Sequence, residues 1–498
     1  MANPPSSHFG TTLFAIPGVA VARHPGTILA PRELRNWVQT LPFGNPPNAA
    51  QQLLQQLRLL VRDPEPGAKF EALLDVYEAP TLRLLEIVGE REPVTSGHLV
   101  PLDQLEHALL DLLAEFAFGR LRGANRLTHA GKPVPAALLF RAAELLDAAD
   151  NIERLHFGAS NTRHWPTLMA IFLHADADGS AGTEVAPKLG YGGGNGPRNV
   201  AGLFFRALVI GMCDPNHHNP QDVADWYRWI GNHTALLELS MLPQGPFSIP
   251  VDISGQASPL HGARRSKPGT STRYLVTDAF LKALHDDAEA PPELYRCLSD
   301  LIKGRKTPEQ RQNPRQARVH PFRLSVGLHK VHARLSSLTN GTAAAAGTPL
   351  ACVQINQSKT GAAFHIDNPS PGALAIGDVL LAETDNPKPG GAPLGFVGRI
   401  QRLVTDHAQR VEIGVEKLDG RVMPLTLTGA AADRVRGDNV GLLHHSPGQA
   451  RPVLLVSRSV YRENDTATAT CANGTLTLRM RQLLDGSART ALIEVSED

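Results

Sequence analysis

The chain has few cysteines and few aromatic residues, and both shortages exclude common kinds of protein. Its cysteines are four and far apart: Cys213, Cys297, Cys352 and Cys471. They form no Cys-x-x-Cys pair, which disfavours a zinc or iron–sulfur site built on cysteine. They fit instead as buried thiols in a reducing compartment. Aromatic residues make up only 5% of the chain, so leucine, valine and alanine must fill most of the cores.

Net charge and long hydrophobic runs are also missing. The 49 Lys and Arg residues balance 48 Asp and Glu residues, which argues against general nucleic-acid binding, so no DNA partner is expected. The most apolar helical stretch, 203–213, is too short to span a bilayer and contains Arg206. The N-terminus shows no charged segment leading into an apolar run. These absences predict a cytoplasmic protein without a membrane span.

What the sequence does contain is a change of pattern along its length. With 498 residues and 42% hydrophobic content, the chain is long enough for two or three domains. From about residue 31 to 242, leucines recur with helical spacing, as in 49–61 and 101–121. From residue 319 onward, short apolar runs predict strands. A helical first half followed by a β second half predicts a multidomain protein of α-then-β type.

One short motif stands out in the β half: Asn356-x-Ser358-x-x-Gly361, directly after an apolar run at 350–355. On a strand, residues two apart point to the same face of the sheet, so Asn356 and Ser358 would present an amide and a hydroxyl together. Gly361 permits a turn with positive φ or a close backbone approach. Such a pair on a rigid strand can hold a flat polar ligand. The structural alternative is a strand end whose side chains cap the backbone.

An arginine-rich segment precedes this motif. Arg311 and Arg315 form an Arg-x-x-x-Arg pair, and Arg318 adds a third cation. Between residues 303 and 334 there are nine Lys and Arg residues and one acidic residue, so the basic excess is local. Arginine forks match phosphate oxygens and the O6/N7 edge of guanine, because two parallel donors meet two acceptors. Taken alone, the segment would be interpreted as a solvated linker between domains.

The order of these two motifs resembles the PilZ domain family, the bacterial receptor module for cyclic di-GMP. The resemblance covers residues 311–420, and further points of similarity are the short sequences at 377–379, 397–400 and 413–416. It implies a small antiparallel β-barrel that carries Asn356, Ser358 and Gly361 on its surface. It also implies an arginine segment that wraps over the bound dinucleotide.

The resemblance assigns roles to the site residues. Arg311 and either Arg315 or Arg318 would contact phosphate and guanine, with the choice between the last two left open. Asn356 and Ser358 would bind a guanine edge, and Gly361 would keep the surface open. The residues between the arginines and the motif include 336–348, rich in Ala, Gly, Ser and Thr, which we interpret as an inserted loop.

Four segments follow from the pattern and the resemblance together. They are a mainly helical domain at 1–245, a mixed connector at 246–305, a PilZ-like barrel at 306–425 and a β extension at 426–498. The strands of the last segment would either extend the barrel or form a second small β unit. The predicted function is that of a cyclic di-GMP effector that passes the signal to a protein partner, without a cofactor. The helical half matches no family on inspection.

Two other functions remain open. The barrel could be a non-binding relative that serves as a protein-interaction module. The helical half could instead be a metal-dependent enzyme, because Cys213 to His218 contains adjacent histidines, His217 and His218. Adjacent histidines on a loop diverge and no His-x-x-x-His completes them, so a polar connection between helices is favoured. No order of Ser, His and Asp or of Cys and His suggests a catalytic set, and we expect no enzymatic activity.

Overall fold

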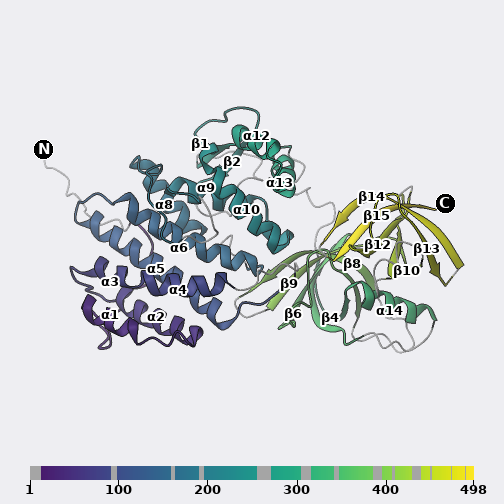
Figure 1. Ribbon diagram of the computed structural model, residues 1–498, viewed down its shortest axis with the longest axis horizontal. Coiled ribbons are helices and arrows are strands. Elements are labelled where there is room, and N and C mark those ends of the chain that lie inside the picture. Colours follow the sequence, from purple (N-terminus) through teal and green to yellow (C-terminus); the bar gives the residue numbers. More distant parts are fainter. Residues whose placement is uncertain are drawn as a thin grey trace.

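The computed structural model shows a helical region at one end, a first β-barrel in the middle and a second β-barrel at the far end (Figure 1). This arrangement confirms the predicted α-then-β order of a multidomain chain. None of the described helices combines the length and apolarity that crossing a bilayer requires. The structure describes residues 13–90, 98–158, 163–189, 196–254, 259, 271–303, 316–340, 347–384, 395–406, 410–428, 439–448, 451–472, 474–487 and 489–497.

The helical region is built from leucine-rich helices that share one hydrophobic core. Polar caps fix where several of them begin. Asp103 and Glu106 form a capping box in which each carboxylate accepts the other residue's backbone N–H, both at 2.8 Å. Asn45 and Asn199 accept backbone N–H groups at two other helix starts. The helices are α1 (Pro31–Gln39), α2 (Pro46–Val61), α3 (Phe70–Val76), α4 (Glu78–Gly89), α5 (Gln104–His129), α6 (Ala136–Leu155), α8 (Trp165–Ala177), α9 (Val200–Met212) and α10 (Pro220–His233).

A small sheet and two helices follow the helical region. β1 (Glu238–Ser240), β3 (Thr272–Val276) and β2 (Ser248–Asp252) pair antiparallel in that spatial order. They precede α12 (Asp278–Asp286) and α13 (Pro292–Ile302). The buried side chains of this part, such as Leu275, Phe280 and Leu298, belong to the same hydrophobic core as the helices before them. The segment predicted as a connector therefore packs against the helical region.

The first barrel closes through the strand order β4-β5-β6-β9-β8-β7, with every neighbouring pair antiparallel. Its core is formed by alternating inward-facing residues such as Phe364, Ile400 and Ile413, each 0% exposed. The strands are β4 (Gln316–Val326), β5 (Leu350–Gln357), β6 (Gly361–Asp367), β7 (Val379–Thr384), β8 (Gly395–Thr405) and β9 (Arg410–Lys417).

A helix that the sequence pattern did not predict stands between β4 and β5. The interpretation of 336–348 as an inserted loop is wrong at its start, because α14 spans Leu328–Asn340. Leu328, Val331 and Leu335 recur at helical spacing and pack into an apolar cluster between the two barrels. Residues 341–346 lie outside the described part of the chain.

The strands of the C-terminal segment form a second closed barrel and do not extend the first one. Their order around the barrel is β10-β11-β12-β15-β14-β13. If the six strands of each barrel are numbered along the chain, both barrels have the same order, 1-2-3-6-5-4. The predicted division at residues 425/426 falls inside the first of these strands. The strands of the second barrel are β10 (Arg421–Thr428), β11 (Val440–His445), β12 (Val453–Ser457), β13 (Thr466–Cys471), β14 (Gly474–Gly486) and β15 (Thr490–Glu497).

The helical region docks onto the first barrel by backbone hydrogen bonds and inserted side chains. The Leu99 N–H donates to the Leu374 carbonyl at 2.7 Å, and the Thr405 N–H donates to the Phe157 carbonyl at 2.9 Å. Leu99 and Phe157 are buried and belong to the barrel's own core. Phe157 has a φ of 58°, which costs a non-glycine residue about 1–2 kcal/mol. Burial of its ring, worth about 1.5–3 kcal/mol, offsets that cost.

The two barrels meet through polar contacts as well as through α14. Arg489 donates to the Asp378 carboxylate at 3.1 Å, and the Thr490 hydroxyl donates to the Gly377 carbonyl at 3.0 Å. Asp378 is 1% exposed, and burial raises its pKa to about 7 even though the guanidinium of Arg489 lies beside it. The junction therefore includes the buried polar side chains of Asp378 and Thr490, which help to fix how the two barrels pack against each other.

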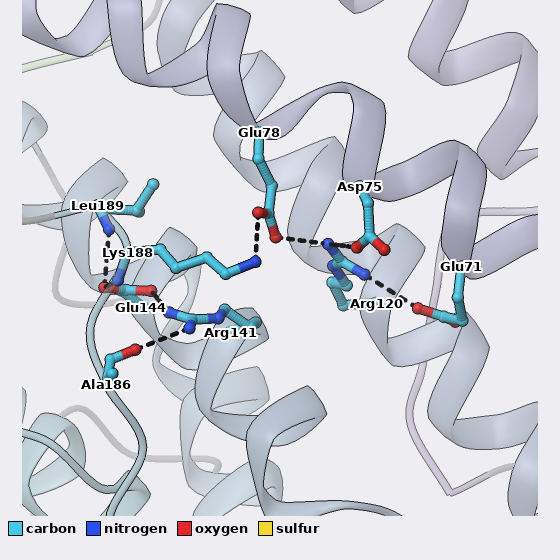
Figure 2. Close-up of polar contacts among 9 residues, drawn as sticks. All are labelled: Glu71, Asp75, Glu78, Arg120, Arg141, Glu144, Ala186, Lys188 and Leu189. Carbon is cyan, nitrogen blue, oxygen red and sulfur yellow. Dashed lines mark hydrogen bonds and ion pairs between the residues drawn. The ribbon is translucent and has the colours of Figure 1, made fainter. Parts of the chain in front are cut away.

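A polar network ties the helices of the helical region together (Figure 2). Arg120 of α5 is buried and donates to carboxylates of α3 and α4: Glu71 at 3.0 Å, Asp75 at 2.8 Å and Glu78 at 2.9 Å. Glu78 also contacts Lys188, and the Glu144 carboxylate of α6 accepts the backbone N–H groups of Lys188 and Leu189 at 2.9 and 3.0 Å. The network holds α3, α4 and the segment at 186–189 against the central helices.

Replacing Asn216 with alanine should weaken the contact between the helical region and the first barrel. Its buried side-chain amide donates to the carbonyls of Phe157 at 3.1 Å and Leu403 at 2.9 Å, and removal leaves both carbonyls without that donor. We expect a loss of about 1–3 kcal/mol in the free energy of unfolding, measured by urea denaturation. The exposed neighbour His217→Ala is the control, and equal losses in the two variants would contradict the docking role.

His156 should make the stability of the fold dependent on pH. Its Nδ1 lies 2.7 Å from the Val100 carbonyl and its Nε2 lies 3.4 Å from the Glu106 carboxylate, and both partners accept hydrogen bonds. Burial alone would lower the His156 pKa, but hydrogen bonding and charge from Glu106 raise it above the ordinary 6.5. The protonated ring therefore stabilises the folded state below pH 6.5, and this contribution is lost as the pH rises through the folded pKa.

Comparison of wild type with His156→Gln tests this. The wild type should be the more stable protein at about pH 6 and the difference should shrink by about pH 9. A difference in the free energy of unfolding that does not vary with pH would contradict the assignment.

Candidate functional site

The predicted motif forms the tight hairpin between β5 and β6. The Ser358 N–H donates to the Gly361 carbonyl at 2.7 Å, and the Gly361 N–H donates to the Ser358 hydroxyl oxygen at 3.0 Å. β5 ends at Gln357, so the strand alternation used to place Asn356 and Ser358 on one face does not extend to Ser358. The serine instead starts the turn and closes it with its own side chain.

Gly361 leaves room for another strand that passes close to it. A Cβ atom at this position would lie 3.1 Å from the Val415 carbonyl oxygen of β9 and 3.6 Å from the Ser358 hydroxyl. Of the two reasons for glycine considered from the sequence, the structure therefore supports close backbone approach. Asn356 is half-buried in β5, next to a register shift between Gln354 and Asn356 in the pairing with β6.

The start of β4 lies against the motif. Gln316 pairs with Gln357, and Ala317 pairs with Asn356. Arg318 lies in β4, two residues after Gln316. Arg311 and Arg315 lie outside the described residues. The structure thus brings together Asn356, Ser358, Gly361 and the strand that immediately follows the arginine pair in sequence.

Lys417, at the end of β9, is a residue of this corner that the sequence analysis missed. Its N–H donates to the Thr360 carbonyl at 2.9 Å and its Nζ donates to the Ser358 carbonyl at 3.0 Å. The Nζ also lies 4.9 Å from the centre of the Phe396 ring. No spacing rule singles out this lysine. Only the β6–β9 pairing brings it to the motif turn.

The motif turn and the docking contacts lie at opposite ends of the first barrel. β6 and β9 pair from Gly361 with Glu416 at the motif end to Asp367 with Arg410 at the other end. Thr405, which contacts the helical region, pairs with β9 at that second end. The outer surface between the two ends carries charged side chains on β6, β8 and β9. Arg402 forms an ion pair with Glu412 at 3.1 Å, and His365 Nε2 lies 3.6 Å from the same carboxylate.

The histidines considered as metal ligands contact neighbouring protein side chains. His218 lies edge-on to Trp226, with 4.5 Å between ring centres, and its Nε2 is 3.5 Å from the Cys297 sulfur. His217 contacts Asp214 at 3.4 Å. Within the described residues, no group of three or more His, Cys, Asp or Glu side chains has an arrangement that could hold a metal ion. The metal-dependent enzyme hypothesis therefore has no geometric support in the described part of the molecule.

A family comparison bears on the helical region. Residues 32–244 match the family model described as "Cyclic-di-GMP receptor FimW, N-terminal domain". The matched stretch is less than half of the chain, and it supports a relationship with a family of cyclic di-GMP receptors. It also gives a family to the half of the sequence in which none was found by inspection. No curated protein matches the chain, and the PilZ-like assignment of the barrel stays a prediction.

Replacing Gly361 with valine should distort the hairpin. The new side chain would press on the Val415 carbonyl, and overpacking of this kind costs about 1–3 kcal/mol. Thermal unfolding and the exchange rate of the Ser358 amide measure the effect. Gly18→Val is the control, since nothing lies within 4 Å of the Cβ position at Gly18. A Gly361 variant as stable as that control would show that the close approach is unimportant.

Proposed function

We propose that this protein is a cyclic di-GMP effector whose ligand binds at the motif corner, the surface formed by Asn356, Ser358, Gly361 and the start of β4. The observation that carries the proposal is the strand register in which Gln316 pairs with Gln357. Arg315 precedes Gln316 in the sequence, and consecutive Cα atoms are about 3.8 Å apart. The arginine segment therefore joins the barrel beside the motif. The family match of the helical region to a cyclic di-GMP receptor independently favours the same ligand.

The chemistry of the corner suits a cyclic dinucleotide. Arg311 and Arg315, or Arg318, supply forked donors for phosphate oxygens and for guanine O6 and N7. Asn356 can pair with a guanine edge, because an amide donates and accepts at the same time. The local excess of nine basic residues over one acidic residue at 303–334 favours a ligand with two negative charges.

The proposed role is binding and signalling without catalysis. Ligand binding by the arginine segment would connect two parts of the protein, since residues 304–315 join α13 of the helical side to β4 of the barrel. A change in this connection would be passed to a protein partner. No cofactor is part of the proposal.

A non-binding role for the barrel is the second candidate. The observation that favours it is the Ser358 hydroxyl, which accepts the Gly361 N–H at 3.0 Å and so already has a structural use. In this case the barrel would serve as a protein-interaction module, and its partners would not depend on cyclic di-GMP.

Calorimetric titration with cyclic di-GMP separates the two candidates. Wild type should bind at micromolar ligand, and Arg315→Ala should weaken binding about 10–100-fold, because a charge-assisted hydrogen bond contributes about 1.5–3 kcal/mol. Ser358→Ala should also weaken it. Arg323→Ala is the matched control, since Arg323 is an exposed arginine further along β4.

Wild-type protein that does not bind at tens of micromolar ligand would reject the proposal. Equal losses for Arg315→Ala and Arg323→Ala would reject the assignment of the site and leave only a charge effect.

A further inference from the structure

The two barrels present equivalent corners. In each barrel the first residue of the first strand pairs with the last residue of the second strand: Gln316 with Gln357, and Arg421 with His445. A serine follows directly in both cases, Ser358 in the first barrel and Ser446 in the second. The corner formed by the start of the first strand and the end of the second strand therefore occurs once in each barrel.

The chain that links the barrels fills the second corner. The Asp419 carbonyl lies 2.8 Å from His444 Nε2. Gly420 has a φ of +108°, and a Cβ atom there would lie 2.1 Å from the His445 carbonyl oxygen and 2.9 Å from Pro447. Only glycine fits such a position. The linker, residues 418–420, thus precedes β10 as the arginine segment precedes β4 in the sequence, and it packs against His444 and His445 of β11.

The same linker begins directly after Lys417, which holds the motif turn. Lys417 donates to two carbonyls of the turn, those of Ser358 and Thr360, through its side chain and its backbone. The next N–H, of Leu418, donates to the Val397 carbonyl at 2.9 Å, and the Leu418 side chain packs in the apolar cluster between the barrels. The motif turn is therefore joined to the second corner by a short segment fixed at both ends.

We propose that Lys417 is a positioning residue of the cyclic di-GMP site and that the second barrel, through the linker, holds Lys417 in place. This inference rests on the proposed function. Lys417 fixes the carbonyls of the motif turn, so the turn is already ordered when the ligand arrives and less conformational entropy is lost on binding. The second barrel is then a support for the first site.

Paired lysine variants test the positioning role. Lys417→Met keeps the aliphatic chain and removes the ammonium group, and Lys359→Met removes the same charge from an exposed side chain in the same turn. Lys417→Met should weaken cyclic di-GMP binding about 10-fold, Lys417→Arg should recover part of the loss, and Lys359→Met should change it less than about 2-fold. Equal losses for the two methionine variants would overturn the proposal in favour of a plain charge effect.

The second barrel's part is tested by His444→Ala, which removes the partner of the Asp419 carbonyl. Exchange of the Gly361 amide in the ligand-free protein should become faster, as it should in Lys417→Met, although His444 belongs to the other barrel. Ser446→Ala should leave cyclic di-GMP binding unchanged. Unchanged Gly361 exchange in His444→Ala, with both barrels still folded by circular dichroism, would overturn the coupling.

The proposed function and the positioning role of Lys417 can be rejected independently. If wild type does not bind cyclic di-GMP, the proposed function is wrong, yet amide exchange in the ligand-free variants still decides whether Lys417 and the linker order the turn. If wild type binds and Lys417→Met binds equally well, the positioning role is wrong and the proposed function stands.

Discussion

The backbone pairing between the start of β4 and the end of β5 is the constraint on which the candidate site depends. It brings Gln316 and Ala317 against Gln357 and Asn356, so the strand that follows the arginine pair in sequence and the short polar motif meet at one corner. A register shift lies between Ala317 and His320 in this pairing. Beyond it, a slip by one residue would turn the inward residues of β4, such as Leu324, to the outside. The packing of the barrel core therefore fixes the register of β4 from His320 onward, and the two pairs at the corner lie on the other side of the shift.

The first barrel occupies the middle of the molecule and is held from both sides. At one end, Leu99 and Phe157 of the helical region complete its core. At the motif end, Lys417 leads directly into the second barrel, and α14 fills the space between the barrels. β6 and β9 run between the two ends. The first barrel therefore contacts the second barrel through the linker and α14, and the helical region at the end where Leu374 and Thr405 lie.

The sequence predicted the order of the parts because periodicity depends on local residues. Leu53, Leu57 and Leu60 recur at helical spacing, and all three are buried as that spacing predicts. α14 was missed, since its apolar face is narrow and neighbouring residues are rich in Ser and Thr. The closure of 426–498 into a second barrel was left open, because closure depends on which strands pair over long distances and alternation within a strand does not specify its partners.

The candidate site was predictable only as far as its motifs are continuous in sequence. Asn356, Ser358 and Gly361 were found because they lie in one hairpin. Lys417 was missed because its contact with Ser358 spans 59 positions and exists only once β6 pairs with β9. The hydrogen bond of the Ser358 hydroxyl within its own turn could not be predicted either, since the end of β5 at Gln357 depends on which strands pair with it.

Residue-resolved amide exchange of the whole protein, with and without cyclic di-GMP, tests the central claim most directly. The account predicts that the ligand slows amide exchange at Gln316, Ala317 and the turn from Ser358 to Gly361. The ligand should not slow exchange at His445 and Ser446 of the second barrel. Protection confined to residues 32–244, or stronger at the second corner than at the first, would contradict it.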